Sequence, residues 1–259
     1  MKAIEKELRK IEKAEAHMRI RAEKNVEPVW KRKLEEKIPE KVMGGLQGAF
    51  SKAFYLIFEK GVGMIEKTYD KEALEKEFLI RDYAFELMGG KKEIRRLKKD
   101  VKRNRAAITL GSAVEGIGLG VLGIGLPDVV IWLGVLLRSI YETALKHGYN
   151  YESIEEKLFI LKMMEASLQS GDAWVSVNED VDAYLCQSAH VIPTEKELEE
   201  QIEKTAAVFA TDMLVMKFIQ GVPIVGMIGG AANPIYYQKV MRYVQLKYRK
   251  RYLLSKKMI

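Results

Sequence analysis

The chain has 259 residues, of which 48% are hydrophobic and 31% charged, and its 43 basic and 36 acidic side chains give a net charge of +7. This balance can fill a core and cover a polar surface, which argues against global disorder and against a polytopic membrane protein. The single cysteine, Cys186, excludes an internal disulfide framework and any multi-cysteine zinc or iron–sulfur site.

The start of the chain is highly charged and patterned for a helix. It contains no apolar stretch of signal-peptide length, so we expect a protein that is made and kept in the cytoplasm. Residues 1–37 are mainly strong helix formers, and an apolar stripe interrupted by Glu15 predicts a helix that docks on the rest of the protein. The stripe consists of Ile4, Leu8, Ile11, Met18 and Ala22. We therefore expect an N-terminal charged helix or extension, residues 1–40, and a helical domain, residues 41–259.

Two helical segments and a basic run come next. Residues 46–58 are apolar at helical spacing, and Gly61 and Gly63 are expected to loosen the chain after them. Residues 70–87 resume a mixed helical pattern, and residues 91–105 hold nine basic and two acidic side chains. A basic run beside apolar sequence is attracted by an anionic membrane, although a solvated helix face is the simpler interpretation. The anion-binding candidates in this run are Lys98, Lys99, Lys102, Arg103 and Arg105.

The middle of the chain, residues 107–138, is apolar and rich in glycine, and a second uncharged stretch covers residues 218–238. Each stretch contains glycines four positions apart, a spacing that lets two helices approach closely. The uncharged runs are too short or too interrupted for the roughly twenty residues of a membrane span, so we expect helical hairpins. A buried core hairpin is favoured over an interfacial or re-entrant one. The residues expected at these helix contacts are Gly116, Gly120, Gly226 and Gly230.

Three charges stand out in this apolar region, and they allow two interpretations. In the first, Glu115, Asp128 and Arg138 face a polar site in an apolar groove and could serve catalysis. In the second, which we favour, Asp128 caps its helix, Arg138 pairs with Glu142, and Glu115 faces water. We therefore lean against an enzyme. We expect no cofactor, since residues 118–123 fit G-x-G-x-x-G without the required strand, and no metal site, since no HExxH spacing occurs.

The second half of the chain carries clear helix boundaries. The expected starts are the Pro127-Asp128 turn, the capping boxes Ser153–Glu156 and Thr194–Glu197, and Asn233-Pro234, and an expected stop is His147-Gly148. An acidic helix is expected around residues 179–188. The final helix is basic, and its second group of anion-binding candidates is Arg249, Lys250 and Arg251. No segment alternates as a strand does, so we predict an all-α, compact multi-helix bundle with glycine-rich apolar hairpins and an N-terminal charged helix.

Over residues 105–259 the chain resembles the EcsC family. The matching elements, in order, are Gly116–Gly125, Asp128, Arg138, His147-Gly148, Glu155–Leu161, Pro223–Gly226 and Asn233–Tyr237. The resemblance implies a bacterial or archaeal cytoplasmic protein from a family named after a gene beside an ABC transporter. It implies no established catalytic activity.

These observations favour one function and leave two alternatives. We expect a peripheral module at the inner face of the cell membrane that contacts the membrane surface or a membrane protein, with an ABC transporter suggested by the resemblance alone. The alternatives are an enzyme that acts on a lipid or another hydrophobic substrate, and a soluble helical adaptor. We do not expect nucleic-acid binding, because no recognition motif is present and the acidic residues 161–205 interrupt a basic face.

Overall fold

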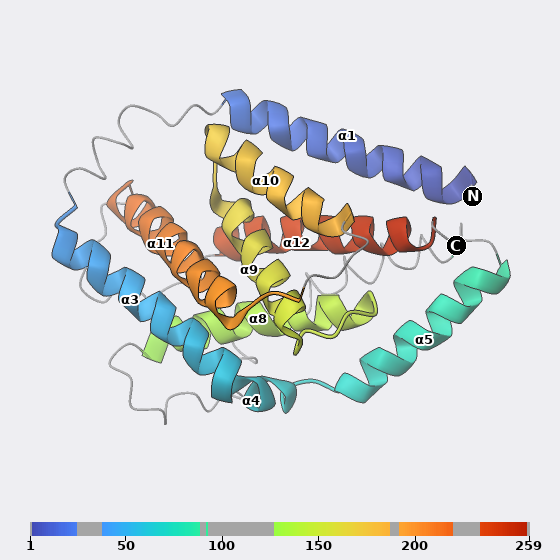
Figure 1. Ribbon diagram of the computed structural model, residues 1–259, viewed down its shortest axis with the longest axis horizontal. Helices are drawn as coiled ribbons and strands as arrows, with labels where there is room; N and C mark the ends of the chain where they lie inside the picture. The colour runs from blue at the N-terminus through green and yellow to red at the C-terminus, as the bar shows by residue number, and fades with distance from the viewer. Residues whose placement is uncertain are drawn as a thin grey trace.

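A computed structural model describes residues 2–24, 38–88, 92, 127–186, 192–219 and 234–257, and all regular structure in these parts is helical (Figure 1). The elements are α1 (Lys2–Lys24), α3 (Glu40–Leu56), η1 (Ile57–Gly61), α4 (Val62–Glu66), α5 (Lys71–Met88), α8 (Pro127–Lys146), α9 (Ile154–Leu168), α10 (Gly171–Cys186), α11 (Glu195–Ile219) and α12 (Pro234–Ser255). The helices pack against one another in a bundle. The predicted all-α class is confirmed.

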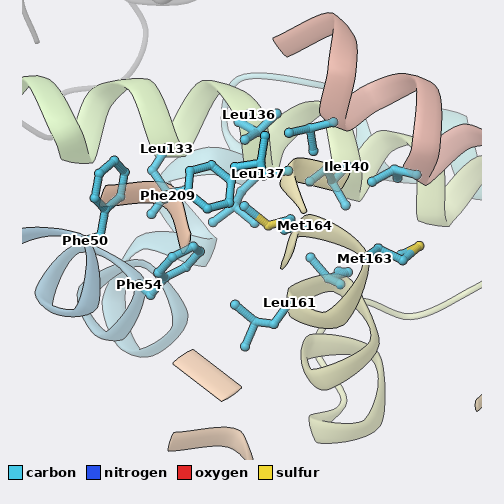
Figure 2. Close-up of a cluster of buried hydrophobic side chains, with 14 of the residues drawn as sticks. Phe50, Phe54, Leu133, Leu136, Leu137, Ile140, Leu161, Met163, Met164 and Phe209 are labelled. Carbon is cyan, nitrogen blue, oxygen red and sulfur yellow. The ribbon is translucent and has the colours of Figure 1, made fainter. Parts of the chain in front are cut away.

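The centre of the bundle is α9, which packs against α10, α11 and α12. Most of its residues are buried on every side, which is the pattern of a helix enclosed by others. The main core joins this helix to α3, α8 and α11 (Figure 2). In it, the ring of Phe209 lies 5.6 Å from Phe50, 6.3 Å from Phe54 and 5.7 Å from Trp132, at the tilted and edge-on angles that aromatic pairs prefer.

The N-terminal helix docks as its pattern predicts. α1 runs along α10 and α12, and Ile11 at the middle of its apolar stripe is completely buried (Figure 1). Together with Ile4 and Leu8, Ile11 forms a second, smaller cluster with residues of α5 and α12. The expected division of the chain at residue 40 stays a prediction.

The glycines after the first apolar segment do not loosen the chain as expected. Gly61 is the last residue of a π-helical turn, η1, and the backbone continues from it directly into α4. A π-helical turn inserts one residue into a helix without breaking it. The chain is therefore helical without interruption from Glu40 to Glu66.

Most of the predicted helix boundaries are confirmed. The Ser153 side chain accepts a hydrogen bond from the Glu156 amide at the start of α9. Thr194 and Glu197 form both halves of a capping box. The Thr194 amide lies 2.7 Å from the Glu197 carboxylate, and the Glu197 amide lies 3.2 Å from the Thr194 hydroxyl. One expectation was wrong: α8 already begins at Pro127, so Asp128 is its second residue and not its N-cap.

The predicted stop at Gly148 anchors another helix. Gly148 adopts a left-handed backbone with φ of +82°, as a helix C-terminal glycine does. The Phe78 ring of α5 lies so close to it that a Cβ on Gly148 would come within 2.2 Å of the ring. Arg81, also on α5, donates a hydrogen bond to the Lys146 carbonyl at the end of α8. α5 is thus fastened to the C-terminal end of α8.

Candidate functional site

Many of the predicted site residues lie outside the described part of the chain. They are the basic group Lys98, Lys99, Lys102, Arg103 and Arg105, the glycines Gly116, Gly120, Gly226 and Gly230, and the acidic Glu115. Their roles stay predictions.

Of the three possible catalytic side chains, the structure describes only that of Arg138. The backbone of Asp128 lies in the first turn of α8. Further along this helix, the Nε of Arg138 donates to the Glu142 carboxylate at 3.1 Å, which is the pairing that the structural interpretation predicts. This guanidinium is engaged on its own helix, and the catalytic interpretation of the three residues stays a prediction.

The second predicted anion-binding group lies on α12 and is largely occupied by the protein itself. The Nζ of Lys250 is 2.7 Å from Glu15 and 2.8 Å from Asp182, and the guanidinium of Arg251 is 2.6 Å from Glu156. Arg249 is mostly buried, and burial lowers the pKa of its guanidinium. These contacts give no support to a role for the group at an external anionic surface.

Glu15, which interrupts the apolar stripe of α1, belongs to a buried charge cluster that the sequence did not predict. The Nζ of Lys247 is completely buried and lies 2.7 Å from both Glu15 and Asp182. Lys250 contacts the same two carboxylates. Burial acts to raise the pKa of Asp182, but the two ammonium groups outweigh it and the pKa is lowered. Two lysines and two carboxylates thus join α1, α10 and α12, and a buried charge needs such partners.

A second buried polar cluster surrounds Glu156. Its carboxylate accepts hydrogen bonds from the Tyr248 hydroxyl and from Arg251, both at 2.6 Å. The Arg251 guanidinium also stacks 3.9 Å above the Tyr149 ring. Burial raises the pKa of Glu156, and the charge of Arg251 opposes that effect. Because each of these groups is held by another and the carboxylate is buried, we interpret the cluster as a structural junction of α9 and α12.

A third polar group joins α4, the start of α5 and the turn before α9. Glu66 accepts hydrogen bonds from Lys71 and from the hydroxyl of Tyr151, which in turn accepts one from Tyr69 at 2.7 Å. Burial acts to raise the pKa of Glu66, but the hydrogen bonds from Lys71 and Tyr151 outweigh it and the pKa is lowered. These hydrogen bonds connect the start of α5 to α4 and to the turn before α9.

The described surface has one feature that the internal contacts do not explain, an apolar stripe on α5. Four large side chains on this helix are 64–72% exposed, and we call them the α5 stripe: Leu79, Ile80, Tyr83 and Leu87. At 100° per residue they fall within a 100° arc, so they form one face. The opposite face carries Phe78 and Phe85, which pack edge-on against Tyr252 of α12. α5 is therefore apolar on both sides, and among the described residues only one of these sides is covered.

The stripe is large enough to matter energetically. Moving a Leu, Ile or aromatic side chain from water to an apolar environment is worth about 1.5–3 kcal/mol when burial is complete. Four side chains that are about two-thirds exposed therefore represent about 4–8 kcal/mol of unused burial. Contiguous apolar patches of this kind mark sites of interaction with a protein or a membrane. The α5 stripe is the candidate functional site.

The described helices show neither a membrane span nor a metal cluster. None of them is both long enough and apolar enough to cross a bilayer. Within the same residues, no three His, Cys, Asp or Glu side chains gather closely enough to hold a metal ion.

Comparison with known proteins agrees with the sequence resemblance and extends it. The model of the EcsC protein family matches residues 2–253, so the match includes α1 and α5 as well as the segment from residue 105 onward. No curated protein and no solved structure matches the chain.

Proposed function

The chain belongs to the EcsC family, and we propose that it is a peripheral module that binds an anionic membrane surface through the α5 stripe. The observation that carries this proposal is the exposure of Leu79, Ile80, Tyr83 and Leu87 on one face of a helix that is fastened to the bundle by its other face. A helix held in this way can lie in the plane of a bilayer with its apolar side among the headgroups. Tyrosine suits that depth because its ring is apolar and its hydroxyl is polar.

The sequence next to the stripe supports a lipid partner over a protein one. α5 ends at Met88, and residues 91–105 carry nine basic and two acidic side chains. Each basic residue near an anionic bilayer contributes about 1 kcal/mol, and an apolar anchor combined with a basic segment gives stable binding where either alone is weak. The proposed setting is the cytoplasmic face of the cell membrane, beside a membrane-protein partner such as the ABC transporter that the resemblance suggests.

Flotation with liposomes tests the proposal. The full chain is mixed with vesicles of phosphatidylcholine alone or with phosphatidylglycerol added, at low and high salt. We expect binding to the anionic vesicles that weakens at high salt, because the charge attraction is screened. We also expect Ile80→Glu/Leu87→Glu to weaken binding at least about tenfold, because each new carboxylate opposes insertion into the headgroup region.

A matched variant controls for the loss of apolar surface and the added negative charge. Ile20 and Ile192 are also exposed, at 47% and 68%, but lie outside the α5 stripe. Ile20→Glu/Ile192→Glu should therefore bind vesicles as the unmodified chain does. Equal binding by the two double variants would overturn the proposal. The proposal would also be overturned if the wild-type chain did not bind vesicles and instead self-associated or bound a protein through this face.

A further inference from the structure

A cavity of about 410 Å³ opens where three helix ends meet. Its walls come from the end of α1, the start of α10 and the start of α12, with the residues just after α9 between them. Met18, Ala22 and Trp174 form an apolar part of the wall. The volume lies within the range of small-molecule sites, which usually combine apolar walls with a few polar groups.

The charged residues that line the cavity are all basic. They are Arg21, Lys239 and Arg242, and no Asp or Glu belongs to the lining. Lys239 donates to the Leu168 carbonyl at 3.2 Å. Within the described chain, Arg21 and Arg242 form no ion pair, whereas Lys247 and Lys250 further along α12 are both paired. The lining of the cavity therefore carries positive charge that the described residues do not neutralise.

The start of α10 also borders the cavity. Gly171, with φ of +60°, lets the helix begin directly after Ser170, and Ser170 and Trp174 both line the cavity. Asp172 lies in the first turn of α10 but does not line the cavity. The cavity thus combines guanidinium groups, an ammonium group, hydroxyl groups and an aromatic wall.

We infer that this cavity binds a phosphate monoester that carries an apolar group. Guanidinium groups recognise phosphate through paired, charge-assisted hydrogen bonds, and two arginines and a lysine line this cavity. Trp174 and Met18 offer the apolar part of the ligand a surface. The ester could be a soluble metabolite or the headgroup of phosphatidic acid, since both present the same phosphate chemistry. This site does not depend on the α5 stripe.

Calorimetric titration of the full chain tests the inference. The probes are inorganic phosphate, phenyl phosphate, and dihexanoyl phosphatidic acid in monomeric form. We expect saturable binding of the two esters, tighter than that of phosphate, with a change in tryptophan fluorescence because Trp174 lines the cavity. Arg21→Gln/Arg242→Gln should weaken ester binding about tenfold or more, and Arg21→Lys/Arg242→Lys should recover part of it.

The matched control is Arg9→Gln/Lys13→Gln. It removes two exposed positive charges from α1 away from the cavity and should change ester binding by less than about twofold. The inference would be overturned if neither ester bound saturably up to about 10 mM. It would also be overturned if Arg21→Gln/Arg242→Gln and Arg9→Gln/Lys13→Gln weakened ester binding equally. Ile80→Glu/Leu87→Glu should bind the esters normally, so a failure of membrane binding is distinguishable from a failure of this site. Competition between phenyl phosphate and phosphatidic acid vesicles tells whether the phosphate monoester that the cavity binds belongs to a soluble metabolite or to a lipid headgroup.

Discussion

The substitution Gly148→Ala tests how α5 is held on the bundle. Gly148 has φ of +82°, and an L-residue in that region costs about 1–2 kcal/mol. A Cβ there would lie 2.2 Å from the Phe78 ring, where carbon atoms normally keep about 3.5–4.0 Å apart. Displacing the ring adds an overpacking cost of about 1–3 kcal/mol. The free energy of unfolding should therefore fall by about 2–5 kcal/mol.

Urea unfolding followed by circular dichroism measures this change. Gly44→Ala is the matched control, because Gly44 lies inside α3 and a Cβ there meets nothing within 4 Å. That alanine should raise the free energy of unfolding by about 1 kcal/mol, since alanine favours a helix over glycine. Exchange of glycine for alanine should thus lower the free energy of unfolding at position 148 and raise it at position 44.

A double-mutant cycle separates the two costs at Gly148. In a Phe78→Ala background the steric part disappears, so Gly148→Ala should cost only the backbone part of about 1–2 kcal/mol. The reasoning is refuted if Gly148→Ala leaves stability unchanged, or if it costs the same with and without the Phe78 ring.

Two further predictions concern buried ionisable groups. Lys247→Met should lower the free energy of unfolding by about 3–5 kcal/mol in the same urea assay, because Glu15 and Asp182 lose a completely buried partner; a loss below about 1 kcal/mol would contradict this. Burial lowers the pKa of His147 to about 3, so the unfolded chain binds the proton first, and stability should fall by up to about 1.4 kcal/mol per pH unit as pH drops below about 6.5. Unfolding curves between pH 7 and 5 should show this slope in the wild type and not in His147→Phe; equal slopes would refute it.

The features that the sequence predicted well are local ones. The caps at Ser153 and Thr194, the proline start of α12 and the glycine stop of α8 each depend on a few neighbouring residues. The apolar stripe of α1 was equally visible, because helical spacing alone places its members on one face. Such signals need no knowledge of the rest of the fold.

The features that the sequence did not predict depend on residues far apart in the chain. Glu15 looked like a flaw in a stripe because its partner Lys247 is 232 positions away. Glu156 looked like half of a capping box, but Tyr248 and Arg251 draw its carboxylate inward. Arg21 and Arg242 share a cavity only once α1 and α12 have packed.

The α5 stripe had a visible signal with an ambiguous meaning. Leu79, Tyr83 and Leu87 recur every four residues, as buried residues of a helix do. Phe78 and Phe85 make the other side apolar as well, so the pattern shows two apolar faces without indicating which one is covered. Only the contacts of Phe78 and Phe85 with Tyr252 and Gly148 in the structure show which face is covered.

The pairing of Glu15 with Lys247 also has a consequence for the chain during its synthesis on the ribosome. During translation at about 5–20 residues per second, roughly 10–50 seconds pass between synthesis of one partner and synthesis of the other. Throughout that interval Ile11, which is completely buried in the finished fold, has no α12 to cover it. The nascent polypeptide therefore exposes an amphipathic segment through most of its own elongation.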